Sequence, residues 1–189
     1  MPHAHQGTPT EILKHEHEVI LRVLTSFETI LKTVEMGARP DPDLAGKVLE
    51  FCRGFADKCH HAKEEDLLFP AMEKAGFPRE GGPVGVMLEE HEQGRAYIQG
   101  IEDAVRLLPE DPETGRKRFL DNGWAYVQLL QAHIHKENEI LFPLADRGID
   151  PDTMHGLIHA FEDTEAAMGE GTHERFLNLA GEIAKRAGG

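Results

Sequence analysis

The sequence has few basic residues, few cysteines and no long apolar run. Lysine and arginine together number 20, against 34 aspartates and glutamates, so the formal net charge is −14 at pH 7. Nucleic acids and anionic membrane surfaces attract basic patches, and such an acidic chain is a poor partner for either. No apolar run approaches the roughly 18 residues that suggest a membrane span. We therefore expect a protein that binds neither nucleic acid nor a membrane.

The two cysteines, Cys52 and Cys59, are too few for a disulfide scaffold, and they share one helical pattern. Residues 1–10 contain neither an apolar core nor basic residues, so no secretion signal is expected. These features favour a reducing, cytoplasmic location. We interpret both thiols as small buried hydrophobic groups, and redox chemistry by the pair is the alternative.

The spacing of apolar residues predicts helices and no strands. Thr8, Pro9 and Glu11 have the pattern of an N-cap, a first helical residue and a capping box. Apolar residues then follow a four-three spacing as far as Val34, which is typical of a bundle helix. Further long helices are expected from about residue 43 to 75, from 83 to 108, and between a loop at 109–115 and residue 147. Shorter helices are expected at 151–168 and 172–186.

The predicted fold class is therefore all-α. Residues 9–147 are expected to form an antiparallel, up-down-up-down four-helix bundle. Residues 148–189 are expected to form a C-terminal extension of two shorter helices, which packs against the bundle or against a second subunit in a homodimer. Residues 1–8 are expected to be a disordered tail.

Two stretches of the chain carry the same pattern. Residues 60–70 read HHAKEEDLLFP and residues 133–143 read HIHKENEILFP, so both contain His-x-x-Lys-Glu-x-x-x-Leu-Phe-Pro. In each stretch a glutamate, Glu64 or Glu137, follows the first histidine by four residues and points the same way from the helix. The two lysines of the pattern are expected to reach solvent.

Each long helix also places one histidine on its buried stripe. In an up-down-up-down bundle these histidines lie at similar depths from the same end, so their side chains are expected to converge. A buried carboxylate is costly unless it is paired or bound to metal, and the facing stripes carry no lysine or arginine. Two divalent cations would remove the repulsion between two such carboxylates. The predicted metal ligands are His17, His60, Glu64, His91, His133 and Glu137.

Two alternatives to a dinuclear site remain open. The histidines could be core residues whose convergence is coincidental, or they could form a mononuclear zinc site, which needs fewer ligands.

Helix geometry predicts which of the neighbouring histidines face the core and which face solvent. His135 lies about 200° around its helix from His133 and is predicted to face solvent. His61 lies only about 100° from His60, and only the comparison of the two repeats argues against it as a ligand.

These motifs resemble the hemerythrin-like family, also called the HHE cation-binding domain. The resemblance rests on KHEHEVI at 14–20, MLEEHEQGR at 87–95 and the two repeats, and it covers roughly residues 10–147. The family has a four-helix bundle that holds a non-heme di-iron centre with an oxo or hydroxo bridge. The resemblance implies that the four stripe histidines are terminal ligands and that Glu64 and Glu137 bridge two iron ions, for which manganese or zinc could substitute.

The sequence departs from the oxygen-carrying hemerythrins. Arg95 stands four residues after His91, where the oxygen carriers have a second histidine. The spacing His133-x-x-x-Glu137 replaces their longer spacing from histidine to aspartate. These differences look closer to di-iron proteins linked to nitric oxide response and iron–sulfur repair. The candidates for a fifth histidine ligand are His61, His155 and His159.

The expected function is that of a di-iron protein whose reduced form binds or reacts with O2, NO or hydrogen peroxide, as a sensor, scavenger or redox protein. An iron donor or store, or an iron–sulfur repair protein, is the alternative. A helical partner-binding module with vestigial ligands is a third class. The sequence contains neither a rubredoxin-like cysteine quartet nor a flavin motif, so the electron donor is unknown and enzymatic activity is left open.

Overall fold

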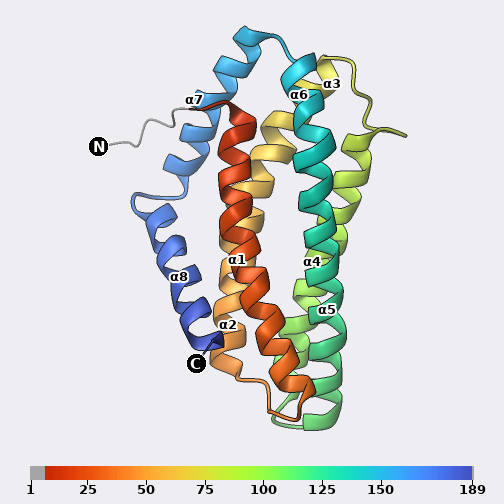
Figure 1. Cartoon of the computed structure of the whole chain (residues 1–189), viewed down its shortest axis with the longest axis vertical. Coiled ribbons are helices and arrows are strands. Elements are labelled where there is room, and N and C mark those ends of the chain that lie inside the picture. The colour runs from red at the N-terminus through yellow and green to blue at the C-terminus, as the bar shows by residue number, and fades with distance from the viewer. Residues whose placement is uncertain (1–6, 189) are drawn as a thin grey trace.

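The structure is a computed structural model that describes residues 7–188, and every regular element in this range is a helix (Figure 1). The predicted all-α fold is confirmed. Of the predicted tail, residues 1–6 lie outside the described residues. The elements, with π-helical ones labelled η, are α1 Pro9–Glu35, α2 Pro42–Phe51, η1 Cys52–His61, η2 Glu64–Leu68, α3 Phe69–Lys74, α4 Pro83–Leu107, α5 Pro112–Lys136, η3 Glu137–Leu141, α6 Phe142–Gly148, α7 Pro151–Ala167 and α8 Thr172–Ala187.

Side-chain caps determine where the helices begin. The capping box predicted for α1 is present, because Thr8 Oγ1 accepts from the Glu11 N–H at 3.3 Å and Glu11 accepts from the Thr8 N–H at 2.7 Å. The side chains of Asp41 and Asp150 cap α2 and α7 by accepting from backbone N–H groups in the first turn of each helix. Asp111 caps α5, which therefore starts at Pro112, inside the stretch that was predicted to be a loop.

Two of the long helical segments are assembled from several elements. The first continues from α2 through η1 and η2 to α3, and the second continues from α5 through η3 to α6. A π-helical turn occurs at the same place in both repeats, since η2 begins at Glu64 and η3 begins at Glu137. Pro70 and Pro143 lack the N–H that an α-helical bond requires, which accounts for the interrupted α-helical bonding just before them. Such π turns often occur at functional sites.

The buried apolar side chains form two clusters along the molecule. On α1, Leu13 belongs to the smaller cluster, whereas Ile20 and Phe27 belong to the larger one. His17 lies between them in the sequence and is also buried. The candidate metal residues of the other segments likewise fall between residues of the two clusters, so they form a polar layer inside the bundle.

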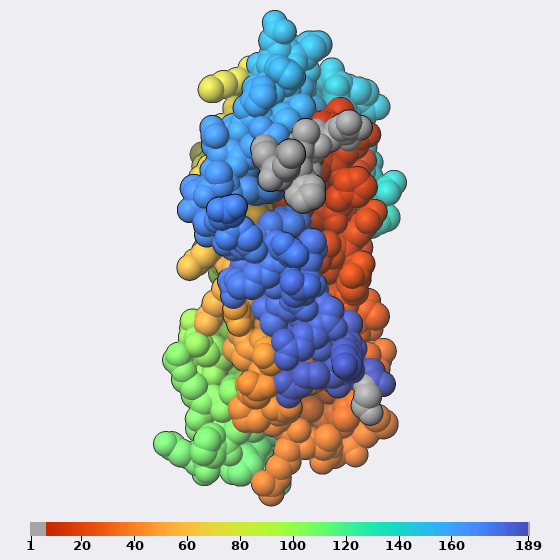
Figure 2. Space-filling model, turned by 90° about the vertical axis from the view of Figure 1, so that its left-hand side faces the viewer, coloured from red at the N-terminus to blue at the C-terminus, as the bar shows by residue number. Residues whose placement is uncertain are grey.

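The extension packs against the bundle of its own chain. Phe176 and Ile183 of α8 belong to the larger apolar cluster, and Leu157 and Phe161 of α7 belong to the smaller one. Figure 2 shows α7 and α8, in blue, lying over α1 and the segment that starts with α2. This packing does not test the predicted homodimer, which stays a prediction.

None of the helices in residues 7–188 has the length and apolar character needed to cross a membrane.

Candidate metal centre

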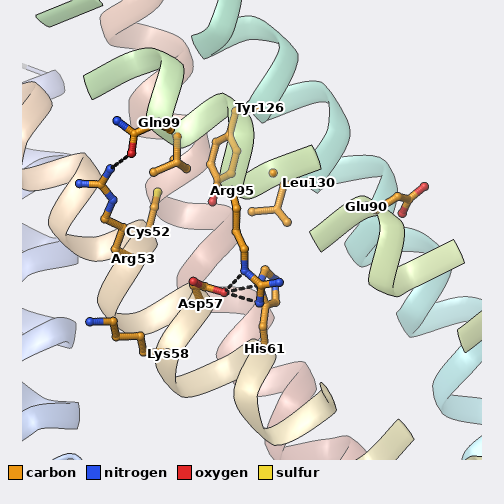
Figure 3. Close-up of a pocket in the computed structure, with 12 residues that line it drawn as sticks. Cys52, Arg53, Asp57, Lys58, His61, Glu90, Arg95, Gln99, Tyr126 and Leu130 are labelled. Atoms are coloured by element: carbon orange, nitrogen blue, oxygen red, sulfur yellow. Dashed lines mark hydrogen bonds and ion pairs between the residues drawn. The ribbon is translucent and has the colours of Figure 1, made fainter. Parts of the chain in front are cut away.

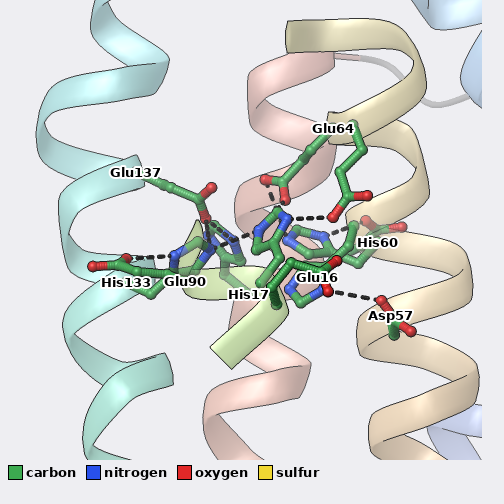
Figure 4. Close-up of polar contacts among 12 residues, drawn as sticks. Glu16, His17, Asp57, His60, Glu64, Glu90, His133 and Glu137 are labelled. Atoms are coloured by element: carbon green, nitrogen blue, oxygen red, sulfur yellow. Dashed lines mark hydrogen bonds and ion pairs between the residues drawn. The ribbon is translucent and has the colours of Figure 1, made fainter. Parts of the chain in front are cut away.

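Five histidines and two glutamates converge in the polar layer, and all of them are buried (Figure 4). α1 and α4 contribute one histidine each, η1 contributes two neighbouring histidines, and α5 contributes one. The two glutamates are the first residues of η2 and η3. The structure brings all six predicted ligands together and adds His61 to them. The seven residues are His17, His60, His61, Glu64, His91, His133 and Glu137.

The ligand atoms fall into two groups, and within each group they all lie within 4.8 Å of one another. The first group consists of His17, His60, Glu64 and Glu137. The second group consists of His61, Glu64, His91 and His133. Glu64 belongs to both groups because its two oxygens face different histidines. Its Oε1 is 3.5 Å from His60 Nε2, and its Oε2 is 3.5 Å from His91 Nε2.

The second carboxylate also contacts both groups. Glu137 Oε2 lies 3.2 Å from His17 Nε2 and 3.2 Å from His133 Nε2. Two glutamates that each lie between two sets of histidines are arranged as bridges between two positions. This is the arrangement that dinuclear carboxylate sites in helix bundles use.

Every histidine of the centre is held from its outer side. In each case Nδ1 lies against a side-chain oxygen of a neighbouring residue. The pairs are His17 with Asn138 (2.8 Å), His60 with Glu16 (2.8 Å), His61 with Asp57 (3.4 Å), His91 with Glu65 (2.6 Å) and His133 with Glu90 (2.9 Å). Because Nδ1 donates outward, Nε2 presents its lone pair to the centre, which is the arrangement of histidines that bind metal.

The inward-facing atoms fit a metal better than they fit one another. Among the described residues, His17 Nε2 and all four carboxylate oxygens of Glu64 and Glu137 are buried without a hydrogen-bond partner. Each such atom costs about 1–3 kcal/mol, and a cation bound in this layer would offset that cost. The Nε2 atoms of His91 and His133 are 3.0 Å apart. Two neighbouring ligands of one ion, each at about 2.1 Å, are separated by about the same distance.

Burial and charge act in opposite directions on the groups of the centre. Burial and the adjacent charge of Glu137 raise the pKa of Glu64 well above its usual value. Burial lowers the pKa of His60 to about 4 and that of His61 well below its usual value, so both imidazoles are neutral. Burial also lowers the pKa of His133, but the Glu137 carboxylate outweighs this effect and raises the pKa to about 9. Bound cations would take the place of such protons.

Three expectations about neighbouring residues can be compared with the structure. His135 is exposed, as predicted. His155 and His159 are also exposed and belong to neither group, which leaves His61 as the fifth histidine of the cluster. The α-helical angle of about 100° made His61 uncertain, but η1 is a π-helix. Its wider turn reduces the angle between neighbouring residues, so His60 and His61 both reach the layer.

The expectation that both repeated lysines reach solvent is wrong for Lys63. Its side chain is fully buried and binds Glu16 at 2.5 Å and Glu165 of α7. Lys136 in the other repeat is 36% exposed. The burial of Lys63 depends on the packing of the extension, which the local sequence does not reveal.

A cavity of about 300 Å³ lies beside the second group (Figure 3). His61, Arg95 and Tyr126 are among its lining residues, and Gly94 forms part of the wall contributed by α4. A methyl group at Gly94 would meet its nearest neighbour, Tyr126, at an ordinary distance of 3.7 Å. Neither close packing nor a left-handed backbone therefore requires glycine here, and Gly94 lines the cavity without a side chain.

A helical bundle with two adjoining histidine–carboxylate groups is the structure of a candidate dinuclear metal-binding protein. The family model described as the hemerythrin HHE cation-binding domain matches residues 4–145. The chain belongs to this hemerythrin family, and the predicted family membership is confirmed.

Individual relatives cover the chain to different extents. The chain is 21% identical to an uncharacterized protein, Mb2018 of Mycobacterium bovis, over 96% of this chain and 71% of that protein. It is 35% identical to the iron-sulfur cluster repair proteins YtfE of Dickeya chrysanthemi and of Salmonella typhimurium. Those matches cover 47% of this chain and 41% of each relative, so the chain spans less than half the length of these YtfE proteins. No solved structure matches the chain.

Proposed function

We propose that the chain is an antiparallel, up-down-up-down bundle of the hemerythrin type that binds two iron ions in its polar layer. In this proposal His17 and His60 bind one ion, and His61, His91 and His133 bind the other. Glu64 and Glu137 bridge the two ions. The observation that carries the proposal is the set of buried inward-facing nitrogen and carboxylate atoms that have no hydrogen-bond partner among the described residues.

The donor set suits iron and leaves room for a small ligand. Imidazole and carboxylate together bind ferrous and ferric iron, and manganese or zinc could occupy the same positions. The first group supplies two histidines, whereas the second supplies three. The ion in the first group therefore retains more open coordination positions. Bound iron would supply redox chemistry and an affinity for small ligands, while the apolar clusters on both sides keep bulk water away.

We propose that the reduced protein binds or reacts with O2, NO or hydrogen peroxide, as a sensor, scavenger or redox protein. The cavity beside His61 supports this role, because it adjoins the second group, which shares Glu64 with the first. Its volume of about 300 Å³ is about ten times the roughly 30 Å³ that one water molecule occupies in the liquid. The electron donor is unknown. A cytoplasmic location, and the absence of nucleic-acid and membrane partners, stay predictions.

The similarity to YtfE favours a second candidate function. These relatives are named iron-sulfur cluster repair proteins, and they match about half of this chain. A repair, donor or storage role requires iron to leave the protein readily. Mild chelation would then strip the metal quickly, whereas a sensing or catalytic centre would retain it. The rate of iron loss to a weak chelator under anaerobic conditions therefore separates the two functions.

The ligand assignment is tested by the iron content of two variants. His60→Ala removes a proposed terminal ligand, and Glu137→Ala removes a proposed bridge. We expect either change to lower the iron content from about two ions per chain to about one or none. Iron content is measured after anaerobic reconstitution and desalting. Wild-type stoichiometry in both variants would contradict the assignment.

A further inference from the structure

Three basic side chains lie behind the histidine–carboxylate pairs that surround the centre. The proposed function assigns no role to Lys63, Arg95 or Lys136. Each of them nevertheless binds a carboxylate that also accepts a hydrogen bond from a histidine of the centre. Four of the five histidines are held in this way. In the fifth pair, that of His17 with Asn138, the acceptor is a neutral amide.

In the 60–70 repeat, the lysine and the histidine bind opposite oxygens of one carboxylate. Glu16 Oε2 accepts from His60 Nδ1 at 2.8 Å, and Glu16 Oε1 accepts from Lys63 Nζ at 2.5 Å. Both oxygens of this buried carboxylate therefore have a donor. Lys63 is three residues after His60, so the two side chains lie on the same face of the helix and reach the same group on α1.

The 133–143 repeat forms the same arrangement with a different helix. Glu90 of α4 accepts from His133 Nδ1 through Oε2, at 2.9 Å, and from Lys136 Nζ through Oε1. The spacing from His133 to Lys136 is again three residues. The repeated lysine of the sequence pattern thus has one role in both halves: it binds the carboxylate that binds the histidine.

Arg95 serves the two remaining pairs together. Its Nε donates to Asp57 at 2.9 Å, and the same Asp57 oxygen accepts from His61 Nδ1 at 3.4 Å. Its Nη2 donates to Glu65 at 2.7 Å, and the same Glu65 oxygen accepts from His91 Nδ1 at 2.6 Å. A guanidinium group can donate to two carboxylates at once because its N–H groups diverge in one plane.

We infer that Lys63, Arg95 and Lys136 are positioning residues of the metal centre. Each one fixes the carboxylate that fixes the orientation of one histidine or, for Arg95, of two histidines on different helices. A carboxylate that lost its basic partner would no longer be held in one orientation, and the imidazole N–H would lose a fixed acceptor. This inference rests on the proposed function, since the orientation of the histidines matters for metal binding.

The exchange rates of the imidazole Nδ1–H protons test the inference residue by residue. These rates can be followed by NMR in the 15N-labelled, zinc-loaded protein. We expect Arg95→Gln to accelerate exchange at His61 and His91 and to leave His133 unchanged. We expect Lys136→Met to do the reverse. Each variant is therefore the control for the other, and uniform acceleration at all histidines, or none at any, would overturn the inference.

Two further variants of α5 separate positioning from charge and from general destabilisation. Lys136→Arg keeps a donor for Glu90, and we expect it to restore slow exchange at His133. Lys117→Met removes an exposed lysine of the same helix, which pairs with Asp121, and we expect it to change no histidine. Fast exchange in Lys136→Arg, or an effect of Lys117→Met equal to that of Lys136→Met, would count against the inference.

A double-mutant cycle shows whether Lys136 acts through Glu90. We expect Glu90→Gln to weaken zinc binding by about 10- to 100-fold, as is usual for the outer partner of a ligating histidine. Lys136→Met should give a smaller loss, and the double variant should bind zinc no more weakly than Glu90→Gln alone. Additive losses would overturn the inference. If the wild-type chain takes up no metal, the proposed function fails instead, and the exchange rates in the metal-free protein still decide the positioning role.

Discussion

The two repeats have the same sequence pattern but different surroundings. In the 60–70 repeat, Lys63 is fully buried and contacts two carboxylates, those of Glu16 and Glu165. In the 133–143 repeat, Lys136 contacts Glu90 and is 36% exposed. The difference arises because Glu165, which α7 of the extension carries, binds Lys63. The same local sequence thus gives a fully buried lysine in one repeat and a partly exposed lysine in the other.

The repeats also differ in the number of histidines that they supply to the metal centre, which is two for the 60–70 repeat and one for the 133–143 repeat. The residue after the first histidine is His61 in one repeat and Ile134 in the other, and both side chains are buried. His61 joins the second metal group, whereas Ile134 belongs to the larger apolar cluster. The same position is therefore polar in one repeat and apolar in the other. This difference accounts for the unequal histidine count of the two groups.

The largest expected effect concerns this extra histidine. We expect His61→Ala to weaken iron binding in the second group, so that part of this iron is lost on desalting, because the group then has two histidines in place of three. His135→Ala is the matched control, since its side chain is exposed on the other repeat, and it should retain the wild-type iron content. Loss of iron in His135→Ala, or full iron content in His61→Ala, would contradict the proposal that the two repeats supply unequal numbers of metal ligands.

The next largest effect concerns the stability of the two halves. Lys63→Met leaves Glu16 and Glu165 without their shared ammonium group, and breaking such a buried pair costs about 3–5 kcal/mol. Lys136→Met disrupts a pair at the surface, where the cost is about 0–1 kcal/mol. Urea unfolding of the metal-free variants measures the difference in the free energy of unfolding. Equal losses would show that the burial of Lys63 adds no stability beyond that of the exposed pair of Lys136.

A smaller effect is expected from filling the cavity beside the second group. Gly94→Leu should place a side chain into the space next to Tyr126 and slow the binding of NO to the reduced protein several-fold. Gly94→Ala is the control, because its methyl group meets only ordinary contacts. Stopped-flow mixing measures the rates, and iron content shows that the centre is intact. Equal rates in Gly94→Leu and the wild type would exclude this cavity as the route.

The smallest effect is expected at Cys52. Burial raises the pKa of this thiol to about 12, so it stays protonated at neutral pH. Cys52→Ala should retain full iron content and NO reactivity and should destabilise the fold by only about 1 kcal/mol, the cost of removing a small buried group. Thermal unfolding and spectroscopy with NO measure both properties. Loss of reactivity with intact iron would instead point to redox chemistry at this thiol.

Much of the fold could be predicted from the sequence because it depends on local patterns. The apolar spacing, the capping box at Thr8 and the prolines near helix ends specified the helices without any tertiary information. The six candidate ligands could also be placed, since periodicity assigns a histidine or glutamate to the inner face of its helix. The structure brings those six side chains together, and their binding of metal stays a prediction.

The remaining features depend on geometry that the sequence pattern does not contain. His61 was left as a candidate because the comparison of the two repeats argued against it, and the π-helical geometry of η1, which brings it into the layer, could not be read from the sequence. The burial of Lys63 could not be foreseen because Glu165 is 102 residues away in the sequence. The partners Glu16 and Glu90 were also missed, although each lies directly beside a stripe histidine in the sequence. Carboxylates next to the ligand histidines were therefore the signal that could have found them.

The most direct test of the account is an anaerobic titration of the metal-free protein with ferrous iron. The titration is followed by the change in the histidine NMR signals and by the amount of iron that remains bound after desalting. The account predicts an end point at about two equivalents per chain, with signals from His17, His60, His61, His91 and His133 all affected. An end point near one equivalent, or binding that leaves these histidines unchanged, would contradict it.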